Sequence, residues 1–79
     1  MLDEIIKRME EDPEYRFVGK YFKNRVADLH STRSDLNYGV CAGYLSCLRT
    51  MGFITSEEEI DGLKELGEIY CGRERVATE

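Results

Sequence analysis

His30 is the single histidine of this 79-residue sequence, and histidine is the residue type best suited to act as a general base near neutral pH. In nucleophilic catalysis a histidine base activates a serine or cysteine beside it, and no spacing in the sequence assigns such a partner to His30. The cysteines, Cys41, Cys47 and Cys71, form no Cys-x-x-Cys pair and therefore match neither a zinc site nor a disulfide framework. We expect no metal, no cofactor and no enzymatic activity, and we predict that the cysteines are reduced thiols of the core.

Acidic side chains occur in two short runs, Glu10-Glu11-Asp12 and Glu57-Glu58-Glu59. Neither run has the alternating oxygen ligands of a calcium-binding loop. Both runs lie where helices are expected to end or begin, and carboxylates at a helix start stabilise the helix dipole. The glycines do not follow the pattern Gly-x-x-x-x-Gly-Lys-Ser/Thr, so the sequence gives no indication of nucleotide hydrolysis.

Basic side chains are concentrated in the middle of a chain whose net charge is −5. Residues 1–14 carry −4, residues 15–50 carry +4 and residues 51–79 carry −5. The acidic balance argues against a protein that mainly coats nucleic acid or an anionic membrane, and we interpret the pattern first as attraction between helices of one molecule. The alternative is a nucleic-acid-binding stripe made of Arg16, Lys20, Lys23, Arg25 and Arg33.

The elements that must position these side chains are helices, because four segments show apolar residues at intervals of three and four. The segments are residues 2–11, 13–29, 35–51 and 56–71. Asp12 marks the first boundary and can cap a helix that begins at Pro13, and a polar linker and Gly52 mark the other two boundaries. Gly52 and Gly72 suit the left-handed residue that ends a helix, and at Gly52 the following Phe53 predicts a Schellman motif with an apolar contact to Leu48. Thr55 or Ser56 can begin a capping box. We predict an all-α bundle of three to four short helices over residues 1–72, with the third helix most buried, and a polar tail at residues 73–79.

The predicted core follows from these helical faces. The first helix directs inward Leu2, Ile5, Ile6 and Met9, and the second Tyr15, Val18, Phe22, Val26 and Leu29. The third contributes Val40, Cys41, Tyr44, Leu45, Leu48 and Met51, and the fourth Ile60, Leu63, Leu66, Gly67 and Tyr70.

Two patterns extend beyond a simple amphipathic face. Phe17 and Tyr21 widen the apolar arc of the second helix to about 180°. Either that helix is covered on both sides within the bundle, or the two aromatic rings contact another protein. Gly39, Gly43 and Cys47 recur every four residues in the third helix, which indicates a close approach by another helix of this domain or by a second copy of the chain.

A short acidic helical chain with the segment Gly52-Phe53-Ile54-Thr55-Ser56-Glu57-Glu58-Glu59 resembles the small accessory proteins of prophages and mobile elements. The resemblance implies an inhibitor of a nucleic-acid-handling host or defence enzyme.

The residues themselves favour a non-enzymatic inhibitor or adaptor that binds another protein. The charged start of the chain resembles neither a signal peptide nor a membrane span, so we expect a cytoplasmic protein without a membrane partner. We predict protein contacts at Phe17, Tyr21, Glu57, Glu58 and Glu59. The three glutamates would bind a basic groove on the partner protein. The alternatives are a nucleic-acid-associated regulator that uses the basic stripe, and a homodimeric structural subunit joined through Gly39, Gly43 and Cys47.

Overall fold

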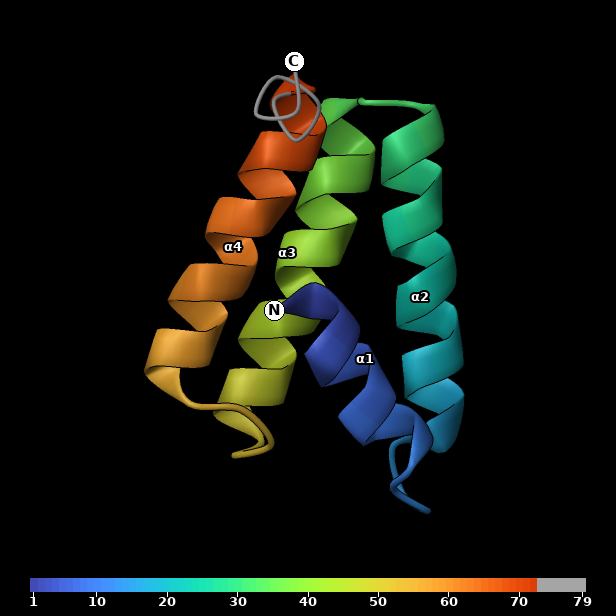
Figure 1. Cartoon of the computed structure of the whole chain (residues 1–79), viewed down its shortest axis with the longest axis vertical. Coiled ribbons are helices and arrows are strands. Elements are labelled where there is room, and N and C mark those ends of the chain that lie inside the picture. The colour runs from blue at the N-terminus through green and yellow to red at the C-terminus, as the bar shows by residue number, and fades with distance from the viewer. Residues whose placement is uncertain (73–79) are drawn as a thin grey trace.

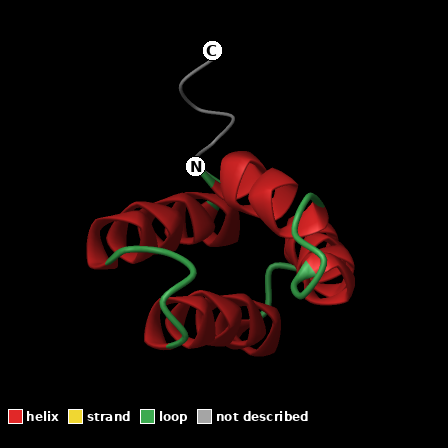
Figure 2. Ribbon diagram, turned by 90° about the horizontal axis from the view of Figure 1, so that it is seen from below, coloured by secondary structure: helices red, strands yellow, loops and turns green. Residues whose placement is uncertain are grey.

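The computed structural model describes residues 1–72 and arranges them as four α-helices: α1 (Leu2–Glu10), α2 (Arg16–Ser31), α3 (Asp35–Thr50) and α4 (Ser56–Cys71). Three helices of similar length, α2, α3 and α4, run side by side in alternating directions, and the shorter α1 crosses in front of them (Figure 1). Seen from the end, the helices surround a common centre rather than forming one layer (Figure 2). The predicted all-α bundle is therefore confirmed. The predicted tail, residues 73–79, lies outside the described residues.

The core is built from apolar residues on one face of each helix. Relative to its length, α1 buries the largest fraction of its residues. All four predicted residues of α1 are buried, whereas α3, with 16 residues, buries only Cys41, Leu45 and Leu48. The prediction that the third helix is the most buried is therefore wrong. The physical reason is that α1 lies in the angle between its neighbours, while one side of α3 faces solvent. The rest of the core consists of Phe22, Leu29, Ile54, Leu66 and Ile69.

The turns show why the helices end where they do. Gly52, at φ 81°, follows α3, and its N–H donates to the carbonyl of Arg49 while the N–H of Phe53 donates to that of Leu48. This pair of bonds is the predicted Schellman ending. Thr55 and Glu58 form the predicted capping box of α4, and Gly72 ends that helix at φ 73°.

The start of α2 differs from the prediction. The Oδ1 atom of Asp12 accepts a hydrogen bond from the N–H of Glu14 at 2.8 Å, and the carbonyl of Asp12 accepts one from Tyr15. Asp12 therefore stabilises a turn over residues 12–15 instead of capping a helix that begins at Pro13, and α2 begins at Arg16 and continues to Ser31.

Several apolar residues predicted to face the core are exposed instead. Met51, directly after α3, and Ile60 on α4 face solvent, and Val18 on α2 and Val40 on α3 are 39% and 37% exposed. In α4 the buried face follows Gly62, Leu66 and Ile69, because a glycine at position 62 lets the side chain of Leu45 lie against the helix backbone. All three cysteines are predicted to lie in the core, but only Cys41 is buried, and Cys47 and Cys71 are exposed.

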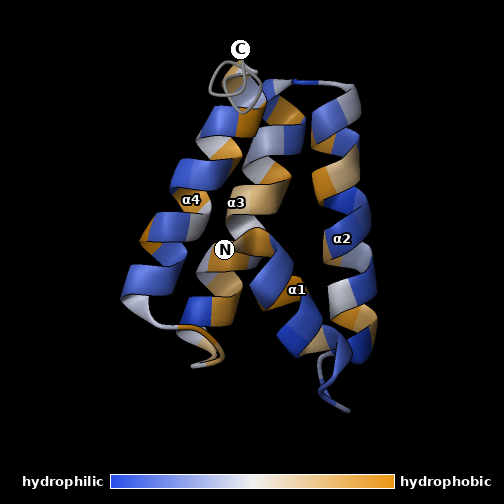
Figure 3. Cartoon of the chain, in the orientation of Figure 1, coloured by the Kyte–Doolittle hydropathy of each residue, from blue (hydrophilic) through white to orange (hydrophobic). Residues whose placement is uncertain are grey.

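Polar residues occur on each turn of α4 in the view of Figure 3, which agrees with its acidic sequence. No helix among residues 1–72 combines the length and the hydropathy that spanning a bilayer requires.

Candidate protein-binding surface on α2 and α3

The aromatic residues of α2 lie on its outer side. Phe17 is 69% exposed and Tyr21 is 58% exposed, so the interpretation that α2 is covered on both sides is wrong. The buried side of the same helix is made by Gly19, Phe22 and Leu29, against which α1 and α3 pack. These neighbours leave the opposite side of α2 uncovered, and the two rings occupy it.

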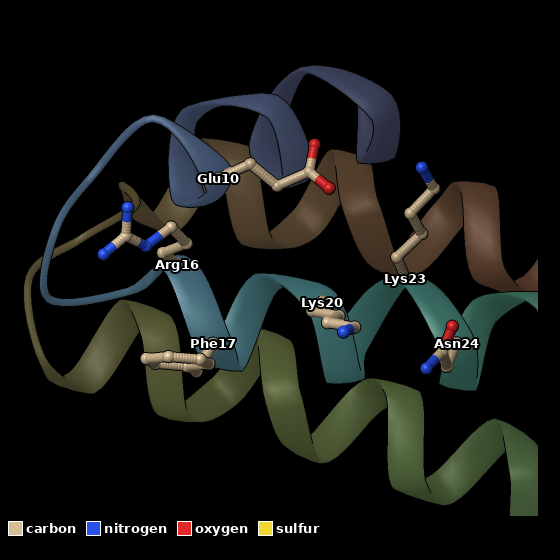
Figure 4. A pocket seen from close by; sticks show the side chains of 6 residues that line it. All are labelled: Glu10, Arg16, Phe17, Lys20, Lys23 and Asn24. Atoms are coloured by element: carbon tan, nitrogen blue, oxygen red, sulfur yellow. The ribbon is translucent and has the colours of Figure 1, made fainter.

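A hollow of about 610 Å³ beside Phe17 is lined by basic side chains (Figure 4). Within residues 1–72, no carboxylate forms an ion pair with Arg16, Lys20 or Lys23, although Glu10 lines the same hollow. The guanidinium carbon of Arg16 lies 5.9 Å from the centroid of the Phe17 ring. In Figure 4 the side chains of Arg16, Lys20 and Lys23 project from α2 in different directions, and Lys23 lies on the side of α1. The surface therefore combines exposed rings with cations that have no acidic partner in the described chain.

The other two members of the predicted basic stripe have structural partners. Arg25 pairs with Asp28 in its own helix at 3.0 Å. The Nε–H of Arg33 donates to the carbonyl of Ile69 at 2.8 Å, which ties the linker between α2 and α3 to the end of α4. The five predicted residues therefore do not form one surface, and the three on the first half of α2 remain together.

The acidic start of α4 is largely engaged inside the molecule. Glu58 accepts a bond from Arg8 of α1 at 2.6 Å, and Glu59 pairs with Arg49 of α3 at 2.6 Å. Backbone hydrogen bonding from Thr55, followed by the bond from Arg8, lowers the pKa of the Glu58 carboxyl. Of the three glutamates Glu57 is exposed, and Glu58 and Glu59 are half-buried. The Arg49–Glu59 pair is the attraction between the basic middle and the acidic end that the charge pattern predicts.

An apolar groove of about 330 Å³ lies between α2 and α3, and it is lined by Val18, Val40, Gly43, Tyr44 and Cys47. A Cβ atom added to Gly39 or Gly43 would meet nothing within 4 Å, so the predicted close approach of another helix of this domain is wrong. Both glycines face outward because α3 is covered by α2 and α4 on its other sides.

The groove contains Gly43 and Cys47 of the predicted self-association stripe, whereas Val18, Val40 and Tyr44 were not predicted as part of a site. Part of the signal for the groove is visible in the sequence. Leu36, Val40, Gly43 and Cys47 are spaced four, three and four residues apart, which places them along one side of α3. Leu36 and Met51, at the two ends of α3, are 75% and 65% exposed. The same spacing is expected for a helix face that is buried in the core, so the sequence alone does not distinguish an exposed apolar stripe from a buried one.

The predicted reactive residues are not assembled into a site. His30 is exposed in the last turn of α2, and Cys41 lies in the core, where burial raises the pKa of its thiol. Among residues 1–72, no three side chains of the metal-binding types come together.

Comparison with protein families, with curated proteins and with solved structures finds no match for this chain.

Proposed function

We propose that this protein is a non-enzymatic protein-binding module, acting as an inhibitor or an adaptor, whose contact surface is the outer side of α2. The observation that carries the proposal is the exposure of Phe17 and Tyr21 beside cations that lack acidic partners within residues 1–72. Tyrosine, phenylalanine and arginine are enriched in the centres of protein interfaces, where a few such side chains supply most of the binding energy.

The charge of this surface indicates the chemistry of the partner. Arg16, Lys20 and Lys23 give the outer side of α2 a positive field, although the whole chain is acidic. A partner with acidic side chains around an apolar centre would complement this surface. Glu57, Glu58 and Glu59 are a weaker candidate contact, because a partner that bound Glu58 or Glu59 would compete with Arg8 or Arg49. The exposed thiols of Cys47 and Cys71 are compatible with work in a reducing compartment such as the cytoplasm.

The test compares the double variant F17A/Y21A with the control I60A. All three side chains are exposed, so each variant should keep its free energy of unfolding within about 0.5 kcal/mol of the native value. Capture of a stoichiometric partner from nuclease-treated host lysate should be lost in F17A/Y21A and kept in I60A. Retained capture by F17A/Y21A would refute the proposed contact surface.

A second candidate function, binding of single-stranded nucleic acid, is favoured by the position of the same cations around the exposed ring of Phe17, on which a base can stack. Three phosphate contacts would make the logarithm of affinity fall with the logarithm of salt concentration with a slope of about −2. Anisotropy of a labelled oligonucleotide measures this slope, and absence of binding at about 50 mM salt removes the candidate.

A further inference from the structure

The hollow beside Phe17 has an excess of positive charge (Figure 4). It is lined by Glu10, Arg16, Phe17, Lys20, Lys23 and Asn24, so three cations and one carboxylate give it a net charge of +2. Within residues 1–72, neither the three cations nor Glu10 form an ion pair. The chain as a whole contains 16 acidic and 11 basic residues. The excess is therefore a local arrangement and does not follow from the composition.

This arrangement of cations works against the stability of α2. Arg16 and Lys20 are four residues apart and Lys20 and Lys23 are three apart, spacings at which like charges on a helix repel each other. Arg16 also belongs to the first turn of α2, which has no acidic residue and where the helix dipole disfavours a cation. Departures of this kind from the rules of helix stability are expected mainly at functional sites. A ligand that carries negative charge explains the cations.

The other lining residues indicate that this ligand is a nucleotide. The ring of Phe17 is 69% exposed, and the guanidinium carbon of Arg16 lies 5.9 Å from its centroid, so a surface for base stacking and a cation are adjacent. A phosphate monoester carries a charge of about −1.5 to −2 at pH 7, which matches the charge of the hollow. The ionised Glu10 accepts hydrogen bonds, and the sugar hydroxyls of a nucleotide donate them. The volume of about 610 Å³ lies within the range of roughly 300–1,000 Å³ that is typical of small-molecule sites.

Two other negatively charged ligands fit the hollow less well. A nucleic-acid strand needs cations beyond the hollow, but Arg25, the next basic residue of α2, is paired with Asp28. The guanidinium of Arg33 is bound to a carbonyl of α4. An acidic protein segment inside the hollow would bring its carboxylates next to Glu10, which repels them. A single small molecule with one phosphate group avoids both difficulties.

We propose that the hollow beside Phe17 binds a free nucleotide, whose base stacks on Phe17 and whose phosphate is held by Arg16, Lys20 and Lys23. This inference goes beyond the proposed function, which concerns a protein partner. Because both ligands use Phe17, a bound nucleotide competes with the protein partner for the outer side of α2.

The first experiment titrates the isotope-labelled full chain with adenosine monophosphate, with adenosine and with inorganic phosphate. The ionic strength is held at about 0.1 M in every titration, because screening by salt changes the attraction between exposed charges. Adenosine monophosphate should shift the backbone amide signals of Phe17, Lys20 and Asn24, with a dissociation constant of about 1 mM or lower. Adenosine and phosphate each offer one part of the ligand and should bind at least about fivefold more weakly. Absence of shifts at about 10 mM adenosine monophosphate, or equal binding by either part alone, would overturn the inference.

The matched variants are K20Q/K23Q, which removes two cations of the hollow, and K7Q/K64Q, which removes two exposed lysines outside it. Both variants change the net charge equally, and none of the four lysines has an ion pair within residues 1–72. Circular dichroism confirms that each variant is folded. K20Q/K23Q should weaken nucleotide binding at least about fivefold, and K7Q/K64Q should change it less than about twofold. Equal effects of the two lysine pairs would contradict a phosphate site in the hollow.

Two single variants test the remaining contacts. F17A removes the stacking surface and should weaken nucleotide binding at least about fivefold. R16Q removes the cation beside the ring, and it takes the place of K20Q/K23Q if that variant unfolds. Binding of the nucleotide at full affinity by F17A or by R16Q would refute the proposed arrangement.

Further outcomes separate this inference from the two functions proposed above. A strand of four deoxyadenosine nucleotides that binds at least about tenfold more tightly than adenosine monophosphate would assign the hollow to nucleic acid and overturn the inference. If adenosine monophosphate does not bind but F17A/Y21A loses the protein partner, the inference fails and the protein-binding function stands. If adenosine monophosphate binds and F17A/Y21A keeps the partner, the nucleotide site stands and the proposed contact surface fails.

Discussion

Gly19 of α2 lies so close to Met9 of α1 that a Cβ atom added to the glycine would stand 2.8 Å from the Cβ atom of Met9. The backbone of Met9 and the N–H of Glu10 are also within 3.5 Å of that position. Both helices therefore approach at a point where only glycine fits, and this contact sets how α1 crosses the bundle (Figure 1).

Replacing Gly19 with alanine should destabilise the domain. Alanine gains up to about 1 kcal/mol of helix propensity, but the added methyl group must push apart the backbones of two helices, which costs about 1–3 kcal/mol. We expect a net loss of about 1 kcal/mol and a melting temperature lower by roughly 4–8 °C. Thermal unfolding followed by circular dichroism measures the shift, and an unchanged or higher melting temperature would show that α1 adjusts without strain.

The opposite result is expected at Gly39 and Gly43. These residues have helical backbone and open space where a Cβ would lie, so alanine gains propensity without a clash. Each substitution should raise the free energy of unfolding by about 0.5–1 kcal/mol. Urea denaturation of G39A, G43A and the double variant tests this, and a loss of stability in either single variant would mean that the glycine has a role inside the fold.

The capping box of α4 gives a pH-dependent prediction. The pKa of the Glu58 carboxyl is lowered in the folded protein, so its ionised form stabilises the fold above the ordinary glutamate pKa, and this contribution is lost as the pH falls through the folded value. E58Q keeps a hydrogen-bonding side chain but removes the charge that meets Arg8. At pH 7 this variant should be less stable than the native chain by about 0.5–1 kcal/mol.

The difference between E58Q and the native chain should shrink as the pH falls from about 6 to about 3, because protonated glutamate resembles glutamine in charge. E57Q is the matched control, since Glu57 is in the same first turn and has no ion pair within residues 1–72. Urea denaturation at several pH values gives both curves. A difference for E58Q that stays constant with pH would contradict the role of its charge.

The parts of the fold that the sequence predicts well are those encoded by neighbouring residues. The apolar face of α1 follows from spacing alone, and the ending at Gly52 and the box at Thr55 need only residues within one turn. The start of α2 does not follow from neighbouring residues alone, because the carboxylate of Asp12 can accept hydrogen bonds either at the start of a helix or within a turn, and here it stabilises a turn.

The candidate surface could be predicted only in part, because exposure depends on which helices are neighbours. Phe17 and Tyr21 are singled out by the width of the apolar arc, yet sequence does not show whether a third helix covers them. The same limit applies to the glycines. Gly19 and Gly62 are close-contact positions and Gly39 and Gly43 are open ones, although all four occupy helix interiors. The groove between α2 and α3 depends on this difference.

The cysteines allow a test of the packing that needs no partner. Cys41 is fully buried and burial raises the pKa of its thiol, whereas Cys47 and Cys71 are exposed on α3 and α4. Because the thiolate is the reactive form, a thiol reagent at about pH 8 should modify two cysteines quickly in the native protein and the third only on unfolding. The variant C41S should keep both fast reactions and lose the slow one. Three fast reactions in the native chain would mean that the core around Cys41 opens readily, and one fast reaction would mean that Cys47 or Cys71 is covered, with C47S and C71S showing which.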